Sequence, residues 1–141
     1  MNDTTKSAIA ITLVPDEQRL DFWFNHFNGI KGWTTFERVI FTTMWIFCDN
    51  YHGGYWKYGT LSNGGAFIYP DINADTLTLF NMHNGNEAPV SQEAAGIVVC
   101  LILYSIWSFQ TKSEVMCDRF YQLRDYASQH PESAAIFHLI D

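Results

Sequence analysis

Two runs of aromatic and β-branched residues, separated by a short Asn-Gly-Gly segment, constrain the fold of this chain most strongly. The runs are Tyr55 to Thr60 and Ala66 to Tyr69, and Asn63, Gly64 and Gly65 lie between them. Asn-Gly supplies the positive φ angles that a tight turn requires, so a β-hairpin is predicted here. A phosphate-binding loop would need a helix directly after the glycines, and the residues that follow do not begin one. We therefore interpret the three residues as a structural turn.

Length and composition favour one compact domain. With 141 residues, of which 48% are hydrophobic and 16% aromatic, the chain can bury roughly two-thirds of its unfolded surface. Met1 to Ser7 is polar and is predicted to be a flexible start, followed by a single domain over residues 8–141. This start has no apolar signal core, so we expect a cytoplasmic protein.

The charge balance limits the kinds of partner. Eight basic and fifteen acidic side chains give a net charge of −7, and the basic residues are scattered along the chain. Direct DNA binding is therefore not expected, because a duplex-binding surface needs clustered Lys and Arg. Nor can the acidic residues imitate a whole duplex, which carries about one charge per 1.7 Å of its axis.

The longest apolar run and the cysteines indicate a buried core. The run from Ala94 to Phe109 contains Gly96 and two serines and is short for a membrane span, so we expect a buried central helix and no membrane. Cys48, Cys100 and Cys117 are odd in number and lie among apolar neighbours. They are predicted to be buried free thiols.

Helical signals precede the hairpin. Pro15, followed by two acidic residues, is a helix start, and Leu20, Trp23, Phe24 and Phe27 then follow helical spacing up to Gly29. A second helix is predicted from the capping-box spacing of Thr34 and Glu37. Its main apolar face contains Phe36, Ile40, Met44 and Phe47, and Phe41, Trp45 and Ile46 suggest that it is covered on more than one side.

Strands and then helices are predicted after the hairpin. Alternation over Thr76 to His83 and a short segment Glu87 to Val90 indicate two further strands, so the middle of the chain should form a meander of three or four antiparallel strands. Helices are expected over Gln92 to Phe109 and Ser113 to Gln129, and a short one after Pro131. The fold class is therefore α+β, with about five helices packed on one face of a small antiparallel sheet.

No catalytic centre is predicted. Cys48 and His52 have a spacing that could suit a metal, but a structural zinc site needs four ligands, and no second pair is present. Cys117 shows no activating base in the sequence, and His130, directly before Pro131, is best explained as a helix cap. We expect no catalytic residue, metal or cofactor.

An acidic stripe is the least ordinary surface feature. Glu114, Asp118, Gln122 and Asp125 recur at helical spacing, and Asp141 follows an apolar segment that should be packed down. A solvated helix face explains the stripe without any function, whereas an acidic docking strip would recruit a basic partner. The candidate partner-binding residues are Glu114, Asp118, Asp125 and Asp141, with support from Asp16, Arg19 and Arg124.

The aromatic hairpin allows another interpretation. Tyr55 and Lys57 should face away from Trp56 and Tyr58, and rows of aromatic residues bind single-stranded nucleic acid when a basic groove accompanies them. Lys57 alone does not make a groove, so core packing or a protein contact is preferred. A nucleic-acid-binding accessory protein of a mobile element stays the main alternative, and a small enzyme with an unrecognised Cys or His site is a third.

The chain as a whole resembles the ArdB/KlcA antirestriction family. The matching residues, in order, are Leu13, Val14, Pro15, Asp16, Arg19 and Leu20; Gly53, Gly54, Tyr55 and Trp56; Leu61, Ser62, Asn63, Gly64, Gly65 and Pro70; Ala94, Ala95 and Gly96; Asp118, Arg119, Tyr121, Leu123 and Arg124; and His130, Pro131, Glu132, Ile140 and Asp141. Each matching segment is short, but together the segments follow the order of the family and extend over nearly the whole chain.

The resemblance implies a small cytoplasmic protein carried by plasmids and genomic islands. Such a protein inhibits type I restriction–modification enzymes and protects incoming unmodified DNA. The resemblance also implies an α+β fold and provides no catalytic residues. We therefore expect a non-enzymatic inhibitor that contacts the restriction enzyme complex as a protein partner, and the sequence leaves homodimer formation open.

Overall fold

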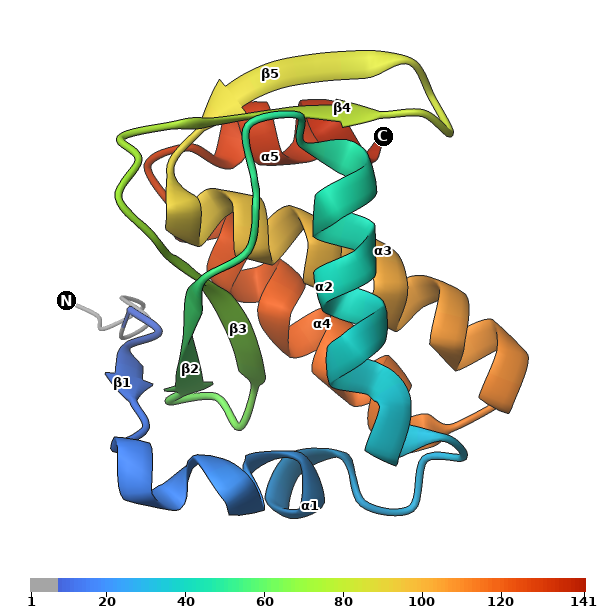
Figure 1. Ribbon diagram of the computed structural model, residues 1–141. Helices are drawn as coiled ribbons and strands as arrows, with labels where there is room; N and C mark the ends of the chain where they lie inside the picture. The colour runs from blue at the N-terminus through green and yellow to red at the C-terminus, as the bar shows by residue number, and fades with distance from the viewer. Residues whose placement is uncertain (1–7) are drawn as a thin grey trace, which may run out of the picture.

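The computed structural model describes residues 8–141 (Figure 1). The predicted flexible start, residues 1–7, lies outside this part. In chain order the elements are β1 (Ile11–Leu13), the 3₁₀ helix η1 (Asp16–Asp21), α1 (Phe22–Phe27), the 3₁₀ helix η2 (Trp33–Thr35), α2 (Phe36–Phe47), β2 (Tyr55–Leu61), β3 (Ala66–Asp71), β4 (Leu77–Asn81), β5 (Asn86–Val90), α3 (Gln92–Thr111), α4 (Glu114–Gln129) and α5 (Ser133–Ile140). The predicted α+β class, with small antiparallel sheets and about five helices, is confirmed.

The strands form two sheets, where the sequence suggested one meander. One sheet has the order β1-β2-β3 and the other contains β4 and β5, and all pairs are antiparallel. The segment between β3 and β4 is held by Gln92, which accepts a hydrogen bond from the Ile72 amide at 2.6 Å and donates one to the Ala74 carbonyl at 2.8 Å. The second hairpin instead packs on α5, to which Asn81 donates a hydrogen bond at the Leu139 carbonyl (Figure 1). Because β4 and β5 pack on α5 and not beside β3, the strands form two separate sheets.

The hairpin of β2 and β3 has the predicted alternation. Trp56 and Tyr58 are buried, whereas Tyr55 is 77% exposed. Asn63, Gly64 and Gly65 connect the strands, and Gly64 has a φ of 95°. The Asn63 side chain accepts from the Gly65 amide at 3.0 Å and donates to the Gln122 carbonyl in α4 at 3.0 Å. The turn is therefore also a contact between the sheet and α4.

The first helical segment has a different phase from the one predicted. Residues Asp16–Asp21 form a 3₁₀ helix, which has three residues per turn, before the α-helical segment begins. Leu20 is consequently 94% exposed and Phe24 points largely to solvent, while Phe22 is buried beside Trp23 and Phe27. The assignment of Leu20 and Phe24 to the buried face was wrong for this reason.

Helix α2 buries the predicted apolar stripe on one side only. Phe36, Ile40, Met44 and Phe47 are buried, but Trp45 and Ile46 are exposed, so the expected cover on a second side is wrong at these two positions. The capping box also does not form, because η2 precedes α2 and moves its N-cap to Thr35, which makes no side-chain cap bond. The Glu37 carboxylate instead accepts hydrogen bonds from Trp23 of α1 and Tyr58 of β2.

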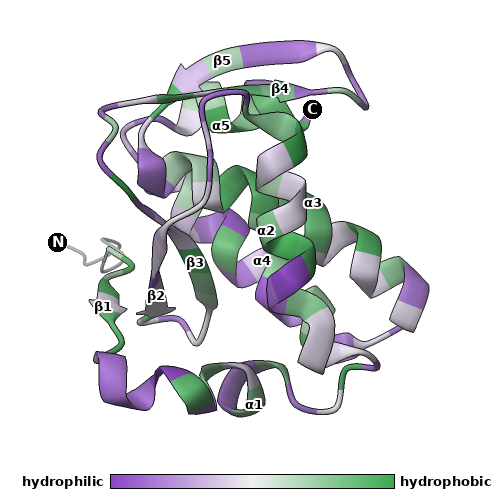
Figure 2. Cartoon of the chain, in the orientation of Figure 1, coloured by the Kyte–Doolittle hydropathy of each residue, from purple (hydrophilic) through white to green (hydrophobic). Residues whose placement is uncertain are grey.

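Helix α3 is the centre of the core in its first half. Residues 94–101 are all buried, in agreement with the predicted central helix, and hydrophobic residues run along the helix (Figure 2). By length and composition alone α3 could span a membrane, but core helices of soluble proteins share these properties, and 56% of its apolar window is buried inside the protein. Gly96 allows its backbone to approach β3 closely. The last turn differs from the prediction, because Phe109 is exposed.

Two buried tyrosines are expected to make the folded state less stable at alkaline pH. Burial, with the Glu37 carboxylate in addition, raises the pKa of Tyr58 to about 12, and burial beside Glu93 raises the pKa of Tyr126 to about 12. An unfolded tyrosine loses its proton near pH 10. The unfolded state therefore binds fewer protons than the folded state above this pH, and stability present below about pH 10 is lost as the pH rises toward 12.

We expect each of these tyrosines to lower the free energy of unfolding by about 1.4 kcal/mol between pH 9 and pH 11. Urea unfolding at the two pH values measures this loss. In Tyr126→Phe the loss between pH 9 and pH 11 should be smaller than in the wild type by about 1.4 kcal/mol, because other buried tyrosines and thiols with raised pKa values contribute the rest. Equal unfolding free energies at both pH values would show that burial does not hold these protons.

Candidate interaction surface

The predicted acidic residues of α4 lie on its exposed side. Glu114, Asp118 and Asp125 are exposed, as their helical spacing indicates. Gln122 is half-buried, because it packs against Gly64 and Gly65 of the hairpin turn. The stripe is therefore a row of three carboxylates, and its fourth member belongs to the fold.

Arg119 does not neutralise this row by an ion pair. Its Nε donates to the His26 carbonyl at 2.8 Å, and its Nη1 donates to the Gly64 carbonyl at 3.3 Å and to the Gln122 side chain at 3.0 Å. It thus joins α1, the hairpin turn and α4. Among the described residues, the ion pairs are Arg19 with Asp16 and His130 with Glu93, so the three carboxylates face solvent unpaired.

Asp16 and Arg19 belong to a different part of the surface. Arg19 approaches Asp16 at 3.6 Å, donates to the Trp56 carbonyl at 2.8 Å, and places its guanidinium 4.3 Å from the centre of the Tyr58 ring. Both residues line a hollow beside Tyr55 and Lys57, and none of the α4 carboxylates lines it. The structure therefore does not bring Asp16 and Arg19 together with the acidic row in one site.

A larger groove lies between α3, α4 and α5. Its volume is about 550 Å³, and Arg124 and Asp141 line it. Leu101, Ile102, Ser105, Ile106, Phe120, Phe137 and Ile140 form the rest of its helical wall, and Asn81 and His83 close the end near β4. Two of the sequence-predicted residues thus meet in one hollow.

The groove continues along the two antiparallel helices. A second hollow of about 260 Å³ shares Ser105 and Phe120 with it and extends to Phe109, Cys117 and Tyr121. We call the two hollows together the α3–α4 trough. The trough was not predicted from the sequence, because the whole apolar run up to Phe109 was assigned to the core. The polar residues Ser105, Ser108 and Gln110 near the end of that run were the signal that this part of α3 is less covered.

Exposed apolar side chains distinguish the trough from an ordinary surface. Phe109 is 82% exposed and Tyr121 is 57% exposed, and Ile106 is also exposed. Cys117 is exposed as well, which corrects the prediction that all three cysteines are buried. Its position on α4, one turn before Tyr121, places it on the solvent side of the helix.

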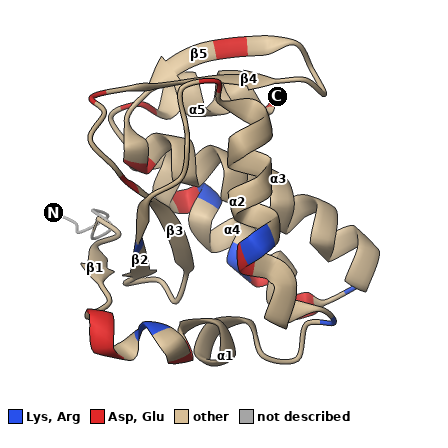
Figure 3. Cartoon of the chain, in the orientation of Figure 1, with Lys and Arg blue, Asp and Glu red and all other residues tan. Residues whose placement is uncertain are grey.

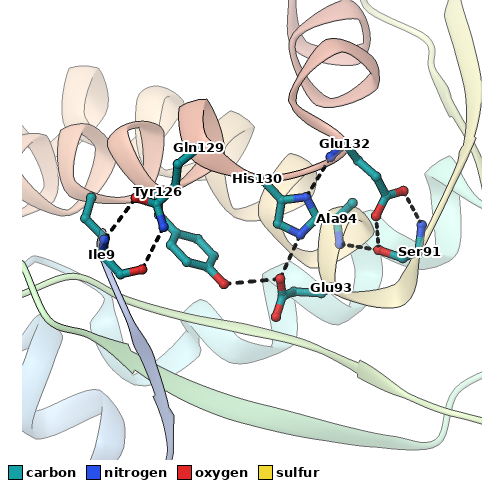
Figure 4. Close-up of polar contacts among 8 residues, drawn as sticks. All are labelled: Ile9, Ser91, Glu93, Ala94, Tyr126, Gln129, His130 and Glu132. Carbon is teal, nitrogen blue, oxygen red and sulfur yellow. Dashed lines mark hydrogen bonds and ion pairs between the residues drawn. The ribbon is translucent and has the colours of Figure 1, made fainter. Parts of the chain in front are cut away.

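A polar network fixes the relative positions of the helices that form the trough (Figure 4). Glu93 of α3 accepts hydrogen bonds from Tyr126 at 3.2 Å and from His130 Nε2 at 2.8 Å. His130, the C-cap residue of α4, accepts at Nδ1 from the Glu132 amide at 3.0 Å in the turn between α4 and α5. The N-cap of α5 is Glu132, which makes no side-chain cap bond. The Glu132 carboxylate in turn accepts from the backbone amide and hydroxyl of Ser91, the N-cap of α3. These bonds join α3, α4 and α5 at one end.

The same close-up shows how the N-terminal strand is attached to α4. Gln129 accepts from the Ile9 amide at 2.9 Å and donates to the Ile9 carbonyl at 2.7 Å (Figure 4). This pair continues the anchoring of β1, whose Ile11 lies opposite Leu61. The network is therefore structural, and it borders none of the hollows described above.

Two of the three cysteine thiols within residues 8–141 are buried. No group of three His, Cys, Asp or Glu residues with the geometry of a metal site occurs there. Burial raises the pKa of the Cys48 thiol, and burial raises the pKa of the Cys100 thiol to about 12. Both thiols are therefore protonated at neutral pH and are poor nucleophiles.

The fold and surface define a small α+β protein with an open apolar trough beside a row of unpaired carboxylates. The model of the antirestriction protein family matches residues 49–141, and the chain belongs to this family. The resemblance found in the sequence is thus confirmed.

Known relatives extend the match over the whole chain. YafX of Escherichia coli K12 is 51% identical over 94% of this chain and 88% of its own length. The antirestriction protein KlcA of Escherichia coli is 34% identical over 99% of both chains. A solved structure from work on KlcA and ArdB superposes with a TM-score of 0.85 at 32% identity, covering 99% of this chain and 100% of the other. KlcA and ArdB are described there as having a novel fold and antirestriction activity against type I DNA restriction systems in vivo but not in vitro.

Proposed function

We propose that this protein inhibits type I restriction–modification enzymes and so protects incoming unmodified DNA. The observation that carries the proposal is the match over the full chain to the KlcA and ArdB structure, with a TM-score of 0.85. The fold and the family are shared, and the antirestriction activity described for KlcA and ArdB is transferred here on that basis.

We also propose that the protein acts through protein contacts and without catalysis of its own. The two buried thiols are protonated, and the exposed side of α4 offers carboxylates and apolar residues suited to a protein partner. A full DNA mimic is disfavoured, because fifteen acidic residues are diluted by eight basic ones. Because the target enzyme acts on DNA in the cell, we also propose a cytoplasmic location. Protection of incoming DNA would benefit mobile elements, so we propose that plasmids and genomic islands carry the protein.

Direct binding to nucleic acid receives no support from the charge distribution. Lys and Arg residues are spread over several elements of the described chain and do not form one continuous stripe (Figure 3). Arg19 and Arg119 are used for internal hydrogen bonds, and Lys57 of the hairpin is half-buried. A basic tract that follows a phosphate backbone is therefore missing from residues 8–141. If the protein nonetheless bound DNA with an affinity that fell steeply with salt, the accessory-protein alternative would replace this proposal.

Expression in cells that carry a type I system should raise the plating efficiency of unmodified phage toward that of modified phage. The experiment is done in cells because the activity of KlcA and ArdB was described in vivo and not in vitro. Modified phage, and cells without the restriction system, serve as controls and should plate equally with and without the protein. Unchanged plating of unmodified phage in the presence of folded protein would reject the proposed function.

A further inference from the structure

We propose that the α3–α4 trough binds a basic amphipathic helix of a protein partner. The inference rests on the proposed function and specifies the surface through which that function is exerted. It is carried by three features of the trough: its shape between two packed helices, its exposed aromatic and aliphatic side chains, and the carboxylates that border it.

The shape of the trough suits a helix. Helices α3 and α4 are antiparallel neighbours, and the two hollows between them share Ser105 and Phe120. On α3 the lining residues Ile102, Ser105, Ile106 and Phe109 follow the i, i+3, i+4, i+7 pattern of one helix face. They span about 10 Å at 1.5 Å per residue. A third helix placed over this groove would contribute apolar residues over two turns, as in other helix-in-groove complexes.

The lining residues suit the centre of an interface. Aromatic residues are enriched at interface centres, and Phe109 and Tyr121 here expose 82% and 57% of their surface. The C-terminal end of α3 extends beyond α2 (Figure 1), and Phe109 lies in this last turn of the helix. Exposed apolar patches beside polar residues are typical of protein contact sites.

The charges beside the trough select the partner. On α4, Cys117 and Tyr121 line the trough, and the exposed carboxylates of Glu114 and Asp118 occupy the adjacent helix positions. Asp141 lines the far end of the trough, where Arg124 is the cation in its wall. Lys or Arg residues flanking the apolar face of a partner helix would meet these carboxylates, and such complementarity speeds association and excludes acidic partners.

The same charges disfavour two other occupants. A second copy of this chain would bring the same acidic residues to the contact, and not the basic residues that complement them. The protein also carries a net charge of −7, which opposes self-association. An anionic membrane surface attracts basic segments and would repel this border.

Paired substitutions test the surface in the plating assay. Phe109→Ser and Asp118→Lys should abolish or greatly reduce the recovery of unmodified phage. The matched controls Leu20→Ser and Asp75→Lys change an exposed apolar and an exposed acidic residue outside the trough and should retain it. All four side chains are exposed, so circular dichroism and thermal melting should show folded proteins. Full recovery by both trough variants would overturn the proposal.

A photo-cross-linking amino acid at position 109 identifies the occupant in the same cells. We expect an adduct that mass spectrometry maps to a segment with apolar residues at i, i+3, i+4 and i+7 flanked by Lys or Arg, and we expect Asp118→Lys to remove it. An adduct to a second copy of this chain, to lipid or to no molecule would overturn the proposal. If the wild-type protein does not restore plating, the proposed function fails by itself, and the identity and Asp118-dependence of the adduct still decide whether the trough binds a basic helix.

Discussion

Gly96→Ala is expected to destabilise the protein, although the same change stabilises an ordinary helix. Alanine is favoured over glycine inside a helix by about 1 kcal/mol. At position 96, however, an added Cβ would meet Tyr69 Cβ, lie 2.5 Å from the Ile68 carbonyl oxygen and lie 2.6 Å from Tyr69 Cα. Two of these atoms are backbone atoms of β3, a strand buried between β2 and α3, so they cannot rotate away.

The overlap should cost about 3 kcal/mol, as in other overpacked cores. The net loss in the free energy of unfolding is then about 2 kcal/mol, which corresponds to a Tm roughly 6 °C lower. Urea unfolding and thermal melting measure both quantities. Gln110→Ala, at an exposed position of the same helix, serves as the control and should change stability by less than about 0.5 kcal/mol. A Gly96→Ala protein as stable as the wild type would show that α3 and β3 separate easily.

Glu37→Ala is expected to lower the free energy of unfolding by about 3 kcal/mol. The Glu37 carboxylate accepts a hydrogen bond from Trp23 Nε1 at 2.9 Å and another from the Tyr58 hydroxyl. Both donors belong to side chains that are at least nine-tenths buried. Removal of the carboxylate leaves them without their partner, and buried donors without an acceptor cost about 1 to 3 kcal/mol each.

Graded substitutions separate this explanation from a simple loss of charge. Glu37→Gln retains an acceptor oxygen and should cost only about 1 kcal/mol, because two neutral hydrogen bonds replace two stronger charged ones and neither donor is left without an acceptor. Glu17→Ala removes an exposed carboxylate and should be nearly neutral. Chemical denaturation followed by tryptophan fluorescence reports the three values. A loss for Glu17→Ala equal to that for Glu37→Ala would assign the effect to net charge and not to the buried donors.

The elements were largely predictable from local patterns, but their ends and faces were not. The hairpin at Asn63 to Gly65 follows from backbone preferences that act within a few residues. The exposure of Leu20 does not, because a 3₁₀ segment before α1 changes which side chains face the core. The capping box of Thr34 and Glu37 failed for a similar reason, since Glu37 is drawn to donors on α1 and β2 that the sequence cannot place nearby.

For the candidate site as well, some features could be predicted from local patterns and others could not. Helical periodicity correctly predicted that Glu114, Asp118 and Asp125 share an exposed face, and their role in partner binding stays a prediction. Asp16 and Arg19 were expected to support this row, but they lie in another hollow. Phe109 was assigned to the core because it ends an apolar run, although the polar residues Ser105, Ser108 and Gln110 beside it indicate a less covered part of the helix.

Local chemistry alone determined that this chain forms helices and antiparallel strands and that it carries an acidic helix face, since these depend on residue type and short spacing. The family was found from the resemblance of its ordered motifs to the ArdB/KlcA proteins. Only the tertiary structure decided that the strands divide into two sheets, that Glu37 joins two distant elements and that an apolar trough opens beside the acidic row. Each of these depends on contacts between residues far apart in the chain, and burial at one position is set by whatever packs against it.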